Sequence, residues 1–355
     1  VLKMKKLFKW FIALILSLLL IIAGLYFYYI YLDTPQKPDT RGELKSTQLD
    51  VDGLARDFIF YIPENVKPDA ALIFVLHGSG SKGEHMRIGT SYGYETLADR
   101  EGFIVAYPTG FDNHWNDCRG SANYAANTEN IDDPAFFRAM INYFSENYTI
   151  SRQRVYATGL SNGGHMAYRL AFEMPDEFAA VAPMAANIPV AESFDCQRSN
   201  QPVSVAIFNG TEDPINPFNG GVVELFGDVS RGTVMSAQES ANYWVSLAGV
   251  TTAPFSQQLP ELDGDPDTSI SVQAWSSDSG VLVRLYTMQG SGHVMPSRTH
   301  SKVARFFGGN AGDLDGVAEV WDFFKAVEAA READSMTNTD SLQLPASTNT
   351  VLGDE

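Results

Sequence analysis

Apolar residues divide the chain into two unlike parts. A run of 23 uncharged, mostly apolar residues extends from position 10 to position 32. Shorter apolar runs then recur between polar stretches, and the last residues are rich in Ser, Thr and Asn without any period. We therefore expect four regions. They are a membrane-inserting head (1–32), a polar, proline-containing stalk (33–45), one globular domain (46–333) and a disordered tail (334–355).

The globular part alternates strand-like and helix-like segments. Continuous apolar runs such as residues 70–76 are typical of strands that are buried on both faces of a parallel sheet. The repeated strand-then-helix order predicts an α/β fold, a mostly parallel central sheet with helices on both faces. The expected strands are 54–62, 70–76, 103–107, 154–158, 178–184, 203–208 and the neighbouring pair 271–275 and 281–287. The expected helices are 90–101, 135–147, 164–173, 236–248 and 317–330.

Charge separates the same two parts. The chain has 25 Lys and Arg against 43 Asp and Glu, a net charge of -18. Residues 1–41 contain six cations and two anions, a balance of +4, which leaves -22 for residues 42–355. This acidity argues against a nucleic-acid partner, because phosphates would repel it. Four lysines (Lys3, Lys5, Lys6 and Lys9) precede the apolar run, so we expect a cytoplasmic N-terminus and an exported, membrane-anchored body.

A cleaved secretory signal is the alternative interpretation of the head, and it would make the protein secreted. The apolar core of such signals is usually about 7–15 residues long and is followed by an A-x-A-like site. No such site follows Ala23-Gly24, so we favour an uncleaved signal anchor. Export would permit a disulfide between Cys118 and Cys196, the two cysteines of the chain. The pairing stays open, because it depends on a distance between their Cα atoms.

The strongest chemical motif is G-x-S-x-G at residues 159–163. It follows a predicted strand and precedes a predicted helix, as a nucleophile turn requires. Such a turn holds its serine in a strained backbone conformation and directs the hydroxyl into the cleft above the sheet. Ser161 is therefore our candidate nucleophile.

A serine nucleophile needs a base, which an acid must orient. In α/β-hydrolases the order along the chain is Ser, Asp or Glu, then His. His293 lies in a glycine-rich loop after a predicted strand and is the preferred base, with His300 as the alternative. Asp213 follows the strand 203–208 and is the preferred acid, with Glu212 as its neighbouring rival.

The oxyanion hole requires two backbone N–H groups. We expect one from Asn162, the residue after the nucleophile, and the other from Ser79 in the glycine-containing loop 77–81. His77 would then orient this loop rather than act as a base. No cofactor is required for this chemistry.

Three other features could have either a functional or a purely structural role. Asp132 and Asp133 precede the serine, so we expect an N-cap for the helix near Ala135. The acidic loop 263–267 could suggest calcium, but it lacks the glycine and glutamate of an EF-hand loop and is interpreted as a solvated loop. Trp115 lies in a polar loop, and we expect it to lie near the substrate.

Several motifs together extend over most of the body. They are LHGSG (76–80), LADREGF (97–103), WND (115–117), DD (132–133), GLSNGG (159–164), GTEDP (210–214), GSGH (290–293) and the segment 315–324. In this order they resemble the secreted polyhydroxybutyrate depolymerase and feruloyl esterase family, which is similar to family-1 carbohydrate esterases.

The resemblance implies an α/β-hydrolase with Ser161, Asp213 and His293 as its triad. The chain departs from the family pattern in two places. The chain has Asn209 where the family often has the histidine of H-G-T, and it lacks the tryptophan that often follows the catalytic histidine.

We therefore expect a serine carboxylesterase that cleaves feruloyl, acetyl or short hydroxyalkanoate esters. The alternatives are a serine peptidase or amidase of the same fold, and a catalytically silent binding module on this scaffold. No separate module for adsorption to a solid polymer is visible, which favours soluble esters.

Overall fold

The computed structural model describes residues 2–29, 35–298 and 305–342. A ten-stranded sheet forms its centre, in the order β1-β2-β4-β3-β5-β6-β7-β12-β11-β10. The strands are β1 (Glu43–Val51), β2 (Leu54–Ile62), β3 (Ala70–Leu76), β4 (Ile104–Pro108), β5 (Ile150–Leu160), β6 (Ala180–Met184), β7 (Ser204–Gly210), β10 (Phe255–Gln258), β11 (Ser269–Ser276) and β12 (Leu282–Gln289). The six central strands are parallel, and two antiparallel strands lie at each end. The predicted α/β fold is confirmed.

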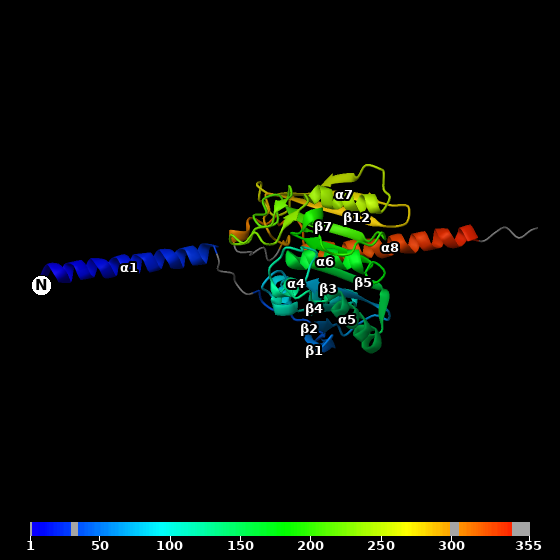
Figure 1. The fold of residues 1–355 in the computed structure, drawn as a ribbon, viewed down its shortest axis with the longest axis horizontal. Coiled ribbons are helices and arrows are strands. Elements are labelled where there is room, and N and C mark those ends of the chain that lie inside the picture. Colours follow the sequence, from blue (N-terminus) through cyan, green and yellow to red (C-terminus); the bar gives the residue numbers. More distant parts are fainter. Residues whose placement is uncertain (1, 30–34, 299–304, 343–355) are drawn as a thin grey trace, which may run out of the picture.

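Helices cover both faces of this sheet (Figure 1). Those within the body are α2 (Gly83–Gly89), α3 (Gly93–Glu101), α4 (Ala125–Thr128), α5 (Asp133–Tyr148), α6 (Asn162–Glu173), α7 (Ala237–Leu247) and α8 (Gly316–Leu342). Helices α5, α6 and α7 pack against one face, and α2, α3 and α8 against the other. A short hairpin of β8 (Gly221–Val222) and β9 (Thr233–Val234) lies outside the main sheet.

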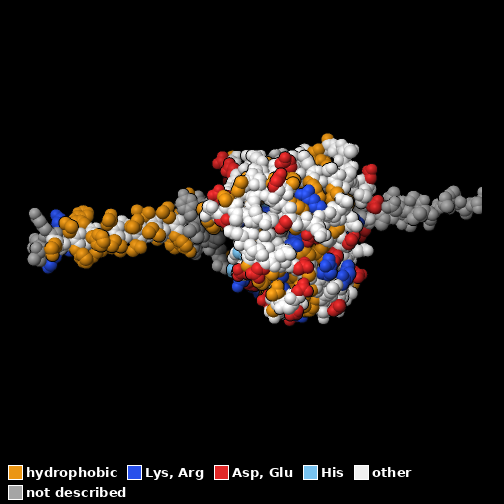
Figure 2. Space-filling view, in the orientation of Figure 1, with side chains coloured by type: hydrophobic (Ala, Val, Ile, Leu, Met, Phe, Trp, Pro, Cys, Tyr) orange, Lys and Arg blue, Asp and Glu red, His pale blue; other side chains and the backbone are white. Residues whose placement is uncertain are grey.

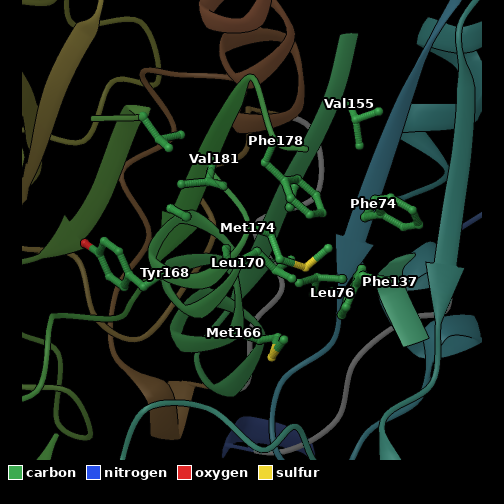
Figure 3. Close-up of a cluster of buried hydrophobic side chains, with 14 of the residues drawn as sticks. Phe74, Leu76, Phe137, Val155, Met166, Tyr168, Leu170, Met174, Phe178 and Val181 are labelled. Atoms are coloured by element: carbon green, nitrogen blue, oxygen red, sulfur yellow. The ribbon is translucent and has the colours of Figure 1, made fainter. Parts of the chain in front are cut away.

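The side chains of β3 show how the sheet separates two hydrophobic layers. All seven residues of this strand are buried. Leu72, Phe74 and Leu76 belong to one cluster, and Ile73 and Val75 belong to the other, because successive side chains of a strand point to opposite faces. Figure 3 shows the first layer, in which Phe74 and Leu76 lie beside aromatic and aliphatic side chains of α5 and α6.

The bounds of β2 and β3 are as predicted, and the expected pair of neighbouring strands is the antiparallel pair β11 and β12. Strands β1 and β10 were not predicted. Residues 43–45, which we expected in the stalk, begin β1. This strand lies at the edge of the sheet and alternates exposed with half-buried residues, so it lacks the apolar run that marks a central strand.

The last helix differs from the prediction at its C-terminal end. We expected a helix to residue 330 and disorder from residue 334, but α8 continues to Leu342. Extending an existing helix costs much less than nucleating a new one, so a packed helix can continue into a polar sequence. Residues 343–355 of the expected tail lie outside the described residues.

The apolar head forms the helix α1 (Leu2–Tyr29), which lies outside the body (Figure 1). An 18-residue window within residues 4–28 has a mean hydropathy of 2.6, and the helix is long and apolar enough to cross a membrane. Figure 2 shows the apolar side chains that cover this helix. A signal sequence would meet the same criterion of length and composition.

Candidate active site

The three predicted triad residues follow three parallel strands of one sheet. Ser161 comes directly after β5, Asp213 after β7 and His293 after β12. Between β5 and β12 the order of strands is β5-β6-β7-β12. Because the strands are parallel, their carboxyl ends meet at one edge, where open α/β sheets bind ligands.

Ser161 lies at the turn between β5 and α6 with φ +57° and ψ -119°. Non-glycine residues seldom adopt this conformation, and it costs about 1–3 kcal/mol. Two backbone hydrogen bonds hold it: the Ser161 N–H donates to the Met184 carbonyl, and the Ser161 carbonyl accepts from the His165 N–H, both at 2.9 Å. The strained serine of the predicted motif is thus present.

Close packing explains the glycines on either side of this serine. A Cβ atom on Gly159 would lie 2.6 Å from the backbone of Gly163 and 2.7 Å from Cβ of Leu76. One on Gly163 would collide with the carbonyl oxygen of Leu76. Strand β3 and helix α6 can therefore approach the turn only because both positions lack a side chain.

The acid and base are in contact. Nδ1 of His293 lies 2.8 Å from Oδ2 of Asp213. The other oxygen, Oδ1, accepts the backbone N–H groups of Ile215 and Asn216, both at 2.8 Å. The Asp213 side chain is 1% exposed and that of His293 is 6% exposed. Glu212 is exposed, so Asp213 is the acid that contacts the histidine.

A neighbouring segment supports the histidine loop. The His293 N–H donates to the carbonyl of Phe307 at 2.7 Å, and the Gly292 N–H donates to that of Gly309 at 2.9 Å. The Ser291 hydroxyl oxygen accepts the Ala311 N–H at 2.7 Å. The alternative base, His300, lies outside the described residues.

Comparison with known proteins gives the family of this chain. The profile described as "Esterase PHB depolymerase" matches residues 57–198, which include Ser161. "Probable feruloyl esterase C" of Aspergillus niger (strain ATCC MYA-4892 / CBS 513.88 / FGSC A1513) is 30% identical over 200 residues, 53% of this chain and 68% of that protein. The chain belongs to the polyhydroxybutyrate depolymerase and feruloyl esterase family.

Two further relatives carry esterase names. "Putative esterase NocK" of Nocardia uniformis subsp. tsuyamanensis is 30% identical over 234 residues, 64% of this chain and 66% of the relative. "Bifunctional acetylxylan esterase/xylanase XynS20E" of Neocallimastix patriciarum is 26% identical over 242 residues, which are 68% of this chain and 31% of that protein. The chain thus spans 31% to 68% of the length of these relatives.

In this esterase-family chain a buried polar network holds Asn162, the residue after the nucleophile. Its Oδ1 accepts the Trp115 N–H at 2.8 Å, and its Nδ2 donates to Oδ2 of Asp117 at 2.6 Å. Asp117 also pairs with Arg119 at 2.6 Å and accepts from the Tyr124 hydroxyl at 3.0 Å. Burial acts to raise the pKa of Asp117, but the charge and hydrogen bonds of Arg119, together with His165, lower it further, so the pKa lies below its usual value.

The network orients the first turn of α6. The first N–H groups of a helix have no partner within the helix, so the backbone N–H of Asn162 is suited to the predicted oxyanion hole. Sequence reasoning found Asn162 but gave no role to Asp117, which it named only within the WND motif, and missed Arg119 and Tyr124. Their link to Asn162 joins positions about 40 residues apart, for which a single sequence contains no local signal.

Trp115 does not occupy the predicted position near a substrate. Its side chain is 0% exposed. The ring packs 5.0 Å from that of His77 and 5.6 Å from that of Phe137, between ring centres, and Nε1 donates to the His77 carbonyl at 3.0 Å. The expectation of substrate contact was wrong, because the polar neighbours of Trp115 belong to a segment whose backbone is fixed against the core.

His77 orients the loop of the predicted second oxyanion donor, as expected. Its Nε2 accepts the Gly110 N–H at 2.9 Å, so Nδ1 carries the proton and donates to the Gly78 carbonyl at 2.8 Å. Burial lowers the pKa of His77 to about 4, which keeps the ring neutral. A Cβ atom on Gly78 would lie 3.5 Å from Cβ of Ser161. The loop that contains Ser79 therefore lies against the nucleophile.

The two cysteines are bonded. Cys118 and Cys196 form a disulfide with their Cα atoms 5.0 Å apart, which answers the question that the sequence left open. The bond lies next to Asp117 and Arg119 in the chain. It therefore fixes the segment on which the Asn162 network is built.

The two acidic residues before the serine have structural roles. Oδ1 of Asp132 accepts the Ala135 N–H at 2.9 Å, which confirms the predicted N-cap. Asp133 is buried and pairs with Arg56 at 2.6 Å. Neither contacts the triad residues in the part of the chain that the structure describes.

Proposed function

We propose that this protein is a serine carboxylesterase that acts through an acyl-enzyme. The observation that supports this most is the buried Asp213–His293 pair at the sheet edge where Ser161 occupies a strained turn. An acid that holds Nδ1–H of a histidine leaves Nε2 free to act as a base. Membership of an esterase family supports ester rather than amide chemistry.

The proposed reaction has two stages. Nε2 of His293 takes the hydroxyl proton of Ser161 while the serine oxygen attacks the ester carbonyl. The backbone N–H groups of Ser79 and Asn162 stabilise the oxyanion. The carbon–oxygen bond to the leaving alkoxide then breaks, and His293 gives that alkoxide the proton. Water, deprotonated by the same histidine, attacks the acyl carbon. The bond between that carbon and the Ser161 oxygen breaks, His293 returns the proton to this oxygen, and the carboxylic acid leaves.

The substrate class follows from the relatives. Their names include feruloyl esterase, acetylxylan esterase and poly(3-hydroxyalkanoate) depolymerase. We propose feruloyl, acetyl or short hydroxyalkanoate esters as substrates. A serine peptidase is less favoured, because these relatives are named for ester hydrolysis.

We further propose that α1 is an uncleaved signal anchor and that the body lies on the exported side of the membrane. Four lysines near the start of α1 and the uncharged, mostly apolar run that follows them support this orientation. The disulfide fits an oxidising compartment. N-terminal sequencing of the protein from washed membranes tests the anchor. A mature N-terminus after residue 23 would instead establish the secreted form.

The activity is tested with the full chain in detergent micelles. Methyl ferulate, acetylated xylan, hydroxybutyrate oligomers, p-nitrophenyl esters and a p-nitroanilide are compared side by side. We expect ester turnover that disappears in Ser161→Ala, while far-UV circular dichroism stays unchanged. Full activity in Ser161→Ala would refute the proposal, and faster turnover of the anilide than of the esters would favour the peptidase.

A further inference from the structure

Three carboxylates from two distant segments meet beside the histidine loop. Glu261 and Asp263 belong to the connection between β10 and β11, and Asp313 precedes α8. One carboxylate oxygen of each lies within 4.8 Å of the other two. Such a grouping of like charges is unfavourable unless something compensates for it.

Asp313 supplies an independent sign that something is bound. This residue is 4% exposed. Its Oδ1 accepts the backbone N–H of Leu262 at 2.6 Å and that of Asp263 at 3.4 Å. Its Oδ2 is buried and has no hydrogen-bond partner among the residues that the structure describes. A buried carboxylate oxygen without a partner is costly, and native proteins seldom leave one unsatisfied.

No side chain in the described ranges neutralises this cluster. None of the ion pairs formed by Lys or Arg within them involves Glu261, Asp263 or Asp313. Asp263 accepts the Gly312 N–H with Oδ2 at 2.6 Å and the Asp265 N–H with Oδ1 at 2.9 Å, and Oε1 of Glu261 accepts the Gly264 N–H at 2.6 Å. These N–H groups are neutral, so they position the carboxylates without neutralising their charge.

We propose that Glu261, Asp263 and Asp313 bind a calcium ion. Calcium prefers six to eight oxygen ligands at about 2.3–2.6 Å, so two ligands on opposite sides of the ion lie about 4.8 Å apart. The three carboxylates fit this spacing, and water or backbone carbonyls would complete the shell. Magnesium requires a tighter octahedron with bonds of about 2.0–2.1 Å. Among the carboxylates of the acidic loop 263–267, Asp263 is the one that joins this site.

The ion would steady the loop of the proposed catalytic histidine. The segment from Phe307 to Asp313 accepts the His293 N–H at one end and provides the buried carboxylate at the other. Between these, the Ala311 N–H donates to the Ser291 hydroxyl oxygen and the Gly312 N–H donates to Oδ2 of Asp263. Calcium would therefore link the connection between β10 and β11 to the segment from Phe307 to Asp313, which supports the His293 loop.

The test measures binding and stability, and it does not depend on the proposed esterase activity. The full chain in detergent micelles is stripped with EDTA and titrated with CaCl2 by isothermal titration calorimetry and differential scanning fluorimetry. We expect one ion per chain and a rise in Tm of about 5 °C at 100 times Kd. In Asp313→Asn the rise should vanish. The fold should persist, because the amide oxygen can still accept the Leu262 N–H.

Two further variants make the test decisive. Glu261→Gln removes an exposed carboxylate of the cluster and should weaken binding at least tenfold, even if Asp313→Asn does not fold. Asp267→Asn removes an exposed carboxylate of the same loop outside the cluster and should keep the full rise in Tm. The proposal is overturned if the wild type binds no calcium up to about 10 mM, ten times the Kd of weak extracellular sites. It is also overturned if all three variants respond like the wild type, or if Asp267→Asn loses binding as completely as Glu261→Gln.

Discussion

Oδ2 of Asp213 and Nδ1 of His293 lie 2.8 Å apart, although 80 residues separate them in the chain. The strands that precede them, β7 and β12, are parallel neighbours. The other carboxylate oxygen is held by two backbone N–H groups. The orientation of the imidazole therefore depends on a carboxylate that has little freedom to rotate.

Asp213→Asn should lower kcat for p-nitrophenyl acetate by about 10³–10⁴-fold. The amide can present an N–H to Nδ1, which favours the tautomer with the proton on Nε2, where the base must be free. Steady-state kinetics measure the effect, and thermal unfolding checks the fold. Glu212→Gln is the matched control and should stay within about twofold of the wild type. A kcat of Asp213→Asn within tenfold of the wild type would show that this carboxylate is not the acid.

Ser161→Gly should be more stable than Ser161→Ala by about 1 kcal/mol, although both are inactive. The backbone at this position has φ +57°, which glycine adopts readily and alanine does not. Urea unfolding of the two variants gives the difference. Equal free energies of unfolding would mean that the turn stores no strain.

Stability should fall as the pH drops from about 6.5 to about 4, partly because of His77. Its pKa is near 6.5 in the unfolded chain and about 4 in the fold. In this window the unfolded chain binds a proton that the folded chain does not. The stability that the neutral His77 ring contributes is therefore fully present above pH 6.5. Acidification removes about 3 kcal/mol of it in total.

The measurement is the free energy of unfolding at pH 7.5 and pH 4.5 for the wild type and His77→Gln. Glutamine is neutral at both values, so its variant should lose less stability on acidification. Buried His165 titrates in the same direction but is present in both proteins and cancels in the difference. The same pH dependence in both would exclude His77 as a source.

Loss of the disulfide should reduce stability substantially. The bond joins residues that are 78 apart, and a loop of that length corresponds to about 4 kcal/mol in the chain-entropy treatment. The Cys118→Ala/Cys196→Ala double variant should show this loss in guanidinium unfolding. An unchanged unfolding midpoint in the double variant would indicate that the bond contributes nothing.

Sequence and structure agree where local patterns are strong. The apolar run of β3 and the G-x-S-x-G turn are determined by burial and backbone strain, which act over a few residues. The choice of Asp213 and His293 followed from the order of such triads along the chain and from their positions after predicted strands. The contact between Asp213 and His293 then agreed with that choice.

The differences concern features that depend on distant parts of the chain. Strand β1 is an exposed edge, so its residues alternate weakly. The Trp115 ring is buried against His77 and Phe137, and its backbone N–H donates to Asn162, 47 residues further along the chain. Asp313 and Asp263 are 50 residues apart in the chain. A single sequence contains no periodicity that would bring such positions together.

The last helix has a consequence for when the protein becomes active. Glu328 of α8 accepts hydrogen bonds from Arg154 at 2.9 Å and from the Tyr156 hydroxyl at 2.7 Å, both on β5. Glu319, nearer its start, accepts from the Tyr286 hydroxyl on β12. The strands that lead to the nucleophile and the histidine are thus fastened by a helix that follows both of them in the chain. A nascent chain that lacks α8 would leave both strands without these contacts, so hydrolysis should begin only after α8 has been made and packed.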